Sequence, residues 1–236
     1  MRPLALALCA LALAGCGSSS SSTAAAAGRA TLWVTRDRGA HVLYVARVPA
    51  GVSVLQALER VAKVKTRFGG RYVRAVDGVE EHGQTAWFYY VNGYLADRSA
   101  ADYRLRRGEV AWWDYRSWSD PLQDPVVVGA FPEPFLHGYD GQRRSAVVVA
   151  LDPANRFVRA VARRLGARTV AAGAGVPSDA NVLYLGGGTT GMRVEARLRG
   201  DASSPGSPIR MLYLGDLDRI ARGGHPFRFR YAVRTQ

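Results

Sequence analysis

Four consecutive aromatic residues followed by a tight-turn signal constrain the fold most strongly. The segment reads Trp87, Phe88, Tyr89, Tyr90, Val91, Asn92, Gly93. It predicts a β-strand from Ala86 to Val91, and the Asn-Gly pair is typical of a tight turn. Alternation along a strand places Phe88 and Tyr90 on one face and Trp87 and Tyr89 on the other. A sheet that contains this strand therefore carries aromatic rings on both of its faces.

The flanking residues predict a first folded unit over residues 31–116. Further strands are expected at Thr31–Thr35, His41–Val48, Tyr72–Val76 and Glu109–Tyr115. Ser53 and Gln56 have the spacing of a capping box, and apolar residues then recur on one helical face. A helix is thus expected from Ser53 to about Val64. Two strands, a helix and three strands, in that order, predict a β-grasp-like α+β domain.

The same unit carries motifs of a known family. They are Ser53-Val54-Leu55-Gln56-Ala57-Leu58, Tyr72-Val73-x-x-Val76-Asp77-Gly78, Trp87-Phe88-Tyr89-Tyr90-Val91-Asn92-Gly93 and Tyr103-x-Leu105-x-x-Gly108-Glu109-x-x-Trp112-x-x-Tyr115. In order and spacing they resemble the transcobalamin-like C-terminal domain, which occurs in bacterial surface lipoproteins. That domain is similar to the β-domain that closes over cobalamin in animal vitamin B12 carriers. Glu109 departs from the family pattern, which usually has Asp at this position.

The resemblance covers about 85 of the 236 residues and implies a ligand-binding role. A corrinoid is the leading candidate ligand. In the vitamin carriers the domain acts beside a much larger helical barrel, which this sequence does not predict. The resemblance therefore implies a surface binding or interaction module rather than a complete vitamin carrier.

Aromatic side chains are the candidate ligand contacts, because flat rings stack well on macrocycles, sugars and bases. The candidates are Trp87, Tyr89, Tyr90, Asn92, Trp112, Trp113 and Tyr115. For each ring the alternative is packing in the domain core. Trp112 and Trp113 are adjacent on a predicted strand and cannot both face one core. At least one of them is expected to meet a partner or the neighbouring unit.

The amino terminus predicts export and lipid attachment. Residues 4–14 contain only Ala, Leu and Cys, a stretch too short to span a bilayer but typical of a secretory signal. A Leu-Ala-Gly-Cys motif ending at Cys16 resembles the lipobox of bacterial lipoproteins. It implies a signal peptide over residues 1–15 and a lipid on Cys16, and a flexible tether is expected over residues 16–30. We expect an extracytoplasmic protein anchored to the cell membrane; the alternatives are an ordinary signal peptide or a buried helix.

A proline-rich segment, residues 117–139, is the expected linker between two units. Its prolines are Pro121, Pro125, Pro132 and Pro134. They argue against a regular helix or a central strand, so residues 131–136 are expected to run extended across a domain surface. Residues 140–236 then predict a small α/β domain of unknown family. Its strands are expected at Ala146–Leu151, Thr169–Ala171, Val182–Leu185, Met192–Leu198, Ile209–Leu214 and Phe227–Val233, and its helices begin at Asp152-Pro153 and near Asp216.

Basic residues outnumber acidic ones, with 32 Lys plus Arg against 19 Asp plus Glu and a formal charge of +13. The arginines are scattered singly or in pairs, which favours a solvated basic surface, and nucleic acid is not an expected partner outside the cell. The second unit alone has 16 arginines and seven acidic residues. An alternative function is therefore an envelope interaction module that binds a protein or an anionic cell-wall polymer through this arginine-rich unit.

No motif predicts an enzyme. His41, His82, His137 and His225 lack metal-ligand spacing, and the sequence has no G-x-S-x-G motif. Gly186–Gly191 fits G-x-G-x-x-G, but the next residues alternate like a strand, whereas a dinucleotide loop must open a helix. A hairpin-type glycine loop is expected instead. The main hypothesis is a noncatalytic, lipid-anchored binding protein, without metal or cofactor, that captures a small ligand such as a corrinoid for a transporter.

Overall fold

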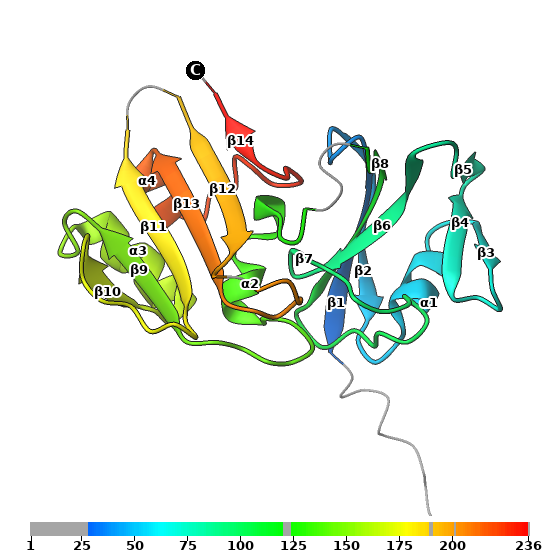
Figure 1. The fold of residues 1–236 in the computed structure, drawn as a ribbon, viewed down its shortest axis with the longest axis horizontal. Coiled ribbons are helices and arrows are strands. Elements are labelled where there is room, and N and C mark those ends of the chain that lie inside the picture. The colour runs from blue at the N-terminus through cyan, green and yellow to red at the C-terminus, as the bar shows by residue number, and fades with distance from the viewer. Residues whose placement is uncertain (1–27, 120–123, 189–190, 201, 236) are drawn as a thin grey trace, which may run out of the picture.

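The computed structural model describes residues 28–119, 124–188, 191–200 and 202–235. The predicted signal peptide, Cys16 and most of the predicted tether lie outside the described residues. Two units, each built on β-sheet, lie side by side with α2 (Glu133–Leu136) between them (Figure 1). The predicted end of the tether is wrong, because Arg29 and Ala30 begin the first strand and Ala30 is fully buried.

The first unit is a sheet-rich α+β structure. Its elements are β1 Arg29–Arg36, β2 His41–Pro49, α1 Val54–Glu59, β3 Val64–Arg67, β4 Tyr72–Val76, β5 Val79–Glu80, β6 Thr85–Val91, β7 Tyr94–Leu95 and β8 Val110–Ser117. The larger sheet has the order β2-β1-β8-β6-β7, and β3, β4 and β5 form a smaller one. Strands β1 and β8 are parallel, and the other pairs in the larger sheet are antiparallel.

Helix α1 begins where the sequence predicts and ends earlier. The Ser53 hydroxyl accepts a hydrogen bond from the Gln56 backbone N–H (3.1 Å), and the Gln56 side chain accepts one from the Ser53 N–H (2.9 Å). These reciprocal bonds satisfy amide groups that have no partner within a helix. The helix ends at Glu59 because Val64 already pairs with Val76 as the first residue of β3. Strand β3 is not predicted because its four side chains are half-buried or exposed.

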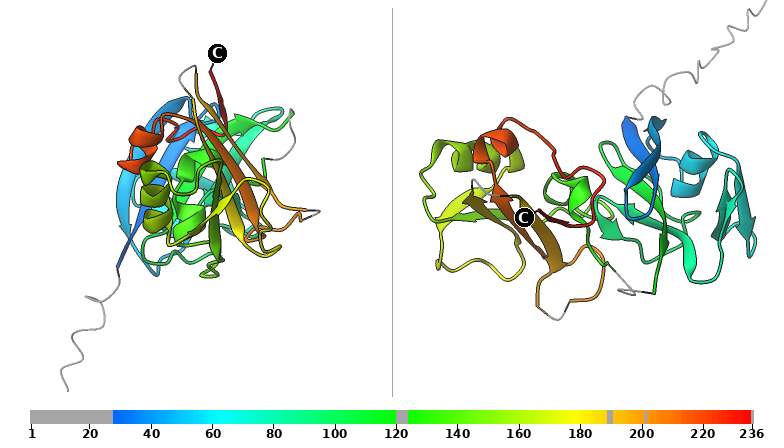
Figure 2. Two further views of the ribbon diagram at one scale, coloured as in Figure 1. Left: turned by 90° about the vertical axis from the view of Figure 1, so that its left-hand side faces the viewer. Right: turned by 90° about the horizontal axis from the view of Figure 1, so that it is seen from above.

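The second unit is an α/β structure, as predicted, on a six-stranded sheet. Its elements are β9 Ala146–Ala150, α3 Arg156–Leu165, β10 Arg168–Ala171, β11 Asn181–Gly187, β12 Arg193–Leu198, β13 Ile209–Gly215, α4 Leu217–Ala221 and β14 Val233–Arg234. The strand order is β10-β9-β11-β13-β12-β14, in which the first four strands are parallel. Helices α3 and α4 lie on one face of this sheet (Figure 2). Helix α3 begins after its N-cap residue Asn155 rather than at Asp152, and Gly166 ends it in the left-handed conformation.

Two predictions for the second unit are wrong. The glycine loop after β11 is not a hairpin turn, because β13 lies between β11 and β12; residues 189–190 of this loop lie outside the described residues. The strand predicted over Phe227–Val233 exists only as β14. Its alternating aromatic residues instead belong to an irregular segment, residues 225–232, which packs against the linker and the first unit. We call this the C-terminal segment.

Residues 131–136 of the linker are packed and partly helical rather than extended across a surface, which corrects a further prediction. Residues Val128–Ala130 form a 3-10 turn (η1), and the short helix α2 follows. Pro134 lies in the first turn of α2, where a backbone N–H has no helical partner, so proline is compatible with this helix. The rings of Phe131 and Phe135 are buried. Residues 126–135 of the linker are thus largely part of the protein interior.

Polar contacts also join each unit to the linker. The Asn92 side chain donates to the Gly138 carbonyl (2.8 Å), and the Asn181 side chain donates to the Pro134 carbonyl (3.0 Å). One continuous cluster of buried apolar residues includes members of both units and of the linker. We therefore treat the two units as one packed body.

Candidate functional site

The two faces of the aromatic strand β6 lead to different surroundings. In register, Tyr89 lies opposite Trp113 of β8, and Tyr90 lies opposite Trp112. The ring centroids are 5.1 Å apart in the first pair and 5.9 Å apart in the second. Because side chains alternate along both strands, these pairs lie on opposite faces of the sheet. The predicted ligand contacts are therefore divided into two groups.

The face with Trp112 is closed. Trp112 and Tyr90 have no exposed surface, and the ring of Tyr231 in the C-terminal segment lies 5.4 Å from each of them. The Trp112 indole N–H donates to the Thr35 hydroxyl (2.7 Å). The structure places these two predicted ligand contacts between the units, where a ligand has no access.

Two more predicted contacts have structural partners. Asn92 is fully buried, and in addition to its bond to the linker it accepts a hydrogen bond from the Val110 N–H (2.8 Å). Tyr115 packs against Trp87 with ring centroids 5.2 Å apart and donates to the Glu80 carbonyl (2.7 Å). Neither Asn92 nor Tyr115 lines the pocket described next.

The face with Trp113 borders a pocket of about 770 Å³. Trp87, Tyr89 and Trp113 line it from the larger sheet, and each is more than nine-tenths buried, so they form its base. The Trp87 indole N–H donates to the Val79 carbonyl (2.9 Å), whereas the buried Trp113 indole nitrogen has no partner among the described residues. A pocket of this volume with aromatic lining is typical of small-molecule sites.

The turn between β3 and β4 forms one wall of the pocket. At its tip Phe68 has a φ of +51°, a left-handed conformation that is unfavourable for a bulky residue. Its side chain is 78% exposed, and its ring meets that of Tyr72 edge-on with centroids 6.4 Å apart. Backbone strain and an exposed apolar ring are both unfavourable for stability. Phe68 therefore points to a role other than stabilising the fold.

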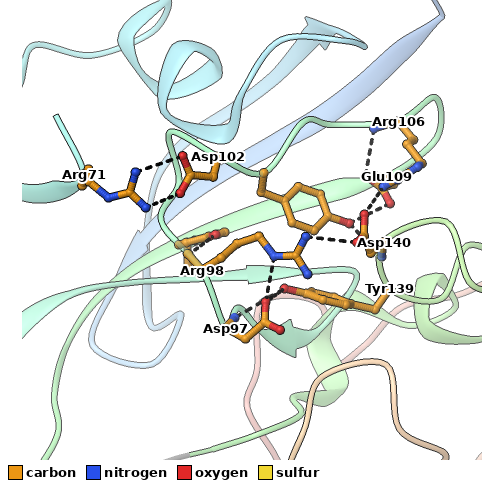
Figure 3. Close-up of polar contacts among 10 residues, drawn as sticks. Arg71, Asp97, Arg98, Asp102, Arg106, Glu109, Tyr139 and Asp140 are labelled. Atoms are coloured by element: carbon orange, nitrogen blue, oxygen red, sulfur yellow. Dashed lines mark hydrogen bonds and ion pairs between the residues drawn. The ribbon is translucent and has the colours of Figure 1, made fainter.

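Residues 95–100, which run from Leu95 of β7 into the loop that follows it, form the other wall, and Arg98 organises this segment (Figure 3). Its guanidinium pairs with Asp97 (3.0 Å) and Asp140 (3.0 Å) and lies over the rings of Tyr103 and Tyr139. Burial opposes ionisation of Asp97, but the hydrogen bond from Tyr139 and the ion pair with Arg98 lower its pKa overall. Asp97 is therefore charged at neutral pH and holds the loop in place.

A further ion pair holds the two walls together. Arg71 on the β3–β4 turn pairs with Asp102 at 2.5 Å (Figure 3), and the Ser99 hydroxyl donates to the Arg71 carbonyl (2.7 Å). At the start of β4, burial and a hydrogen bond to Glu81 raise the pKa of Tyr72 to about 12. Its phenol stays neutral, so the polar groups of this wall are already paired.

Glu109, which departs from the family pattern, lies close to this network (Figure 3). Its carboxylate is 1% exposed and accepts hydrogen bonds from the Tyr103 hydroxyl (3.1 Å) and the Arg106 N–H (2.8 Å). Burial raises the pKa of Glu109 above its ordinary value despite these donors. The residue supports the loop that carries Tyr103, and its side chain does not line the pocket.

Sequence reasoning found the base of the pocket and missed its walls. The missed residues are Phe68, Arg71, Tyr72, Asp97 and Arg98. One signal was present: Phe68 is a lone aromatic residue followed directly by Gly69 and Gly70, a position where an apolar side chain has no core to enter. The contribution of residues 95–100 depends on tertiary contacts and has no local signal.

Within the described ranges, no three His, Cys, Asp or Glu side chains converge as a metal site requires. None of the helices in the described part of the chain is long and apolar enough to cross a membrane.

In a comparison with known proteins, one family model matches the pocket region. Residues 51–117 match a domain of unknown function, DUF4430, and this range contains every residue that lines the pocket. A search of curated proteins finds no significant match to the chain.

Several solved structures are similar to part of the chain, and two of them each have a TM-score of 0.32 and 16% identity over 38% of this chain. One is a protein from Ruminococcus gnavus ATCC 29149 to which metal binding has been ascribed provisionally, and 97% of that chain is covered. The other is haptocorrin in complex with Cbi. The similar region spans 25% of the haptocorrin chain.

Proposed function

We propose that the protein binds a flat, conjugated small molecule in the pocket between the β3–β4 turn and residues 95–100. The observation that carries this proposal is the strained and exposed ring of Phe68 at the edge of a pocket with an aromatic base. A ligand that covers this ring would remove its apolar surface from water and stack on it. A corrinoid is the first ligand to test, because the sequence of this unit resembles the transcobalamin-like domain.

Binding without catalysis is part of the same proposal. The charged side chains that line the pocket, Arg71, Asp97 and Arg98, are each paired. The Tyr89 hydroxyl donates to the Arg98 carbonyl, and burial raises the pKa of Tyr89 far above its ordinary value. A general base or a nucleophile must be free to reach the substrate and must titrate near the working pH. The three charged groups are held in ion pairs and the Tyr89 phenol stays protonated, so a binding role is favoured.

We further propose that Cys16 carries a lipid and holds the protein on the outer side of the cell membrane, where it passes its ligand to a transporter. If so, Cys16→Ser should abolish incorporation of labelled palmitate and move the protein from the membrane to the soluble fraction, because a lipid chain provides the membrane affinity. Cell fractionation measures this partition. Globomycin should block processing of the wild type; unchanged processing, or membrane association of Cys16→Ser, would contradict the proposal.

The binding proposal is tested by titrating hydroxocobalamin into the chain without its signal peptide and following tryptophan fluorescence, corrected for the inner-filter effect. Trp87 and Trp113 line the pocket, so a bound chromophore should quench them with saturation. Stacking on aromatic rings should depend little on salt.

A second candidate function is supported by the sheet of the second unit. Arg197 of β12 lies directly opposite Arg210 of β13, and like charges at such positions destabilise a sheet. Neither guanidinium forms an ion pair with a described residue, although Arg210 lies over the ring of Tyr184 at 4.4 Å. Such a pair favours binding of an anionic polymer. Two results together would favour this function. Binding of an anionic cell-wall polymer would be lost steeply with added salt, and hydroxocobalamin would not quench the tryptophan fluorescence.

A further inference from the structure

A second pocket, of about 500 Å³, lies where the two units and the linker meet. The first unit contributes Trp33 and Val110, the linker contributes Phe131, Glu133 and Leu136, and the second unit contributes Arg164, His225 and Arg228. Its lining combines apolar walls with two arginines. It is separate from the pocket at Phe68, with which it shares no lining residue.

The charges at this pocket favour an anion. Neither Arg164 nor Arg228 has a hydrogen bond or an ion pair with any described residue. The Arg228 guanidinium lies over the rings of Trp33 and Phe229, 4.8 Å from each centroid, so it is held above the pocket wall. The one acidic residue in the lining is Glu133, which is bonded to the ring of His137, and burial raises its pKa. Two guanidinium groups that form no ion pair with a described residue therefore line the pocket together with one carboxyl, which is already bonded to His137.

Two buried nitrogen atoms at the pocket also lack partners. They are the indole nitrogen of Trp33, a residue that is 5% exposed, and Nδ1 of His225. A buried donor without an acceptor is unfavourable. Burial, together with the charges of Arg164 and Arg228, lowers the pKa of His225 to about 4, so its ring is neutral at pH 7. A carboxylate would accept a hydrogen bond from the Trp33 indole N–H and form ion pairs with Arg164 and Arg228.

We infer that this pocket binds a small organic carboxylate. Its carboxylate group lies toward Arg164, Arg228 and the Trp33 indole N–H, and its apolar body packs against Phe131 and Leu136. A ligand held in this way contacts both units and the linker, so it stabilises their packed arrangement.

The test uses 2-naphthoate and its uncharged counterpart 2-naphthamide on the chain without its signal peptide. In ¹⁵N NMR spectra, the indole N–H signal of Trp33, assigned with Trp33→Phe, should shift with saturation on addition of 2-naphthoate. It should not shift with the amide. The double variant Arg164→Gln/Arg228→Gln should weaken binding about tenfold or more, because it removes two charge-assisted contacts.

The matched control is Arg156→Gln/Arg168→Gln, which removes the same charge from two exposed positions of the second unit outside both pockets and should leave the affinity for 2-naphthoate unchanged. Equal weakening in the two double variants would mean non-specific attraction by the basic unit and would overturn the inference. Absence of a saturable Trp33 shift at millimolar 2-naphthoate, or equal binding of the amide, would also overturn it. A stability measurement on each variant verifies that it is folded.

Discussion

Replacing Trp112 with alanine is expected to destabilise the protein by about 3–5 kcal/mol, the range for truncating a large buried aromatic residue. Trp112 has no exposed surface and packs against Trp33, Tyr90 and Tyr231 with ring centroids 5.4–5.9 Å apart. The variant leaves a cavity between the units and removes the hydrogen bond to Thr35. Urea unfolding, followed by circular dichroism, measures the change in the free energy of unfolding.

The control for this variant is Trp118→Ala. Trp118 is 37% exposed, so its loss should change stability much less. If Trp112→Ala kept wild-type stability and lost affinity for hydroxocobalamin, Trp112 would be a ligand contact and the interface described here would be incorrect.

Replacing Asp114 with alanine is expected to destabilise the protein by at least about 3 kcal/mol, because it leaves several buried donors without an acceptor. Asp114 is fully buried. Its carboxylate accepts hydrogen bonds from the Thr35 hydroxyl (2.5 Å), the backbone N–H groups of Arg38 (3.0 Å) and Gly39 (3.2 Å), and the Tyr231 hydroxyl (3.0 Å). Tyr231 belongs to the C-terminal segment, so this carboxylate ties the two units together.

Tyr231→Phe separates the hydrogen bond that Asp114 accepts from the C-terminal segment from the three that it accepts within the first unit. It removes a single donor and keeps the ring, so it should cost about 0.5–3 kcal/mol, the range for one hydrogen bond to a charged group and its neutral counterpart. Thermal and urea unfolding of both variants give the comparison. An Asp114→Ala protein as stable as the wild type would show that the four hydrogen bonds contribute nothing to folding.

The sequence predicted the longer strands of the first unit, β1, β2, β4, β6 and β8, because their side chains alternate or are continuously apolar, and it missed the short strands β3, β5 and β7. It also predicted that Trp112 and Trp113 face opposite sides. It could not predict what covers each side, because Tyr231, which covers Trp112, lies 117 positions after its partner Asp114. The alternation over Phe227–Val233 was read as a strand, yet the same spacing places Phe227 and Tyr231 inside an irregular segment.

The candidate site was predicted in part for the same reason. Trp87, Tyr89 and Trp113 belong to strands with a strong local pattern, whereas the walls come from a turn and a loop that meet through tertiary contacts. Arg71 reaches Asp102 and Arg98 reaches Asp140, pairs separated by 31 and 42 positions. Pairing over such distances leaves no periodic signal in a single sequence.

The linker shows a different limit of predicting structure from sequence. Prolines argue against a helix interior, but Pro134 occupies the first helical turn, where the rule does not apply. Burial of Phe131 and Phe135 then fixes the linker between the units. Composition alone describes this segment as a connection, and its packing makes it part of the interior.

The central claim is that a flat ligand binds at Phe68, and hydroxocobalamin titrations of Phe68→Ala and Leu151→Ala test it most directly. Both replaced side chains are highly exposed, at 78% and 92%, and neither change should unfold the protein. Saturable tryptophan quenching should occur in the wild type and in Leu151→Ala with equal affinity. In Phe68→Ala the dissociation constant should rise about tenfold or more, because the ligand no longer covers an aromatic ring. No saturable quenching in the wild type, or the same dissociation constant in both variants, would contradict the claim.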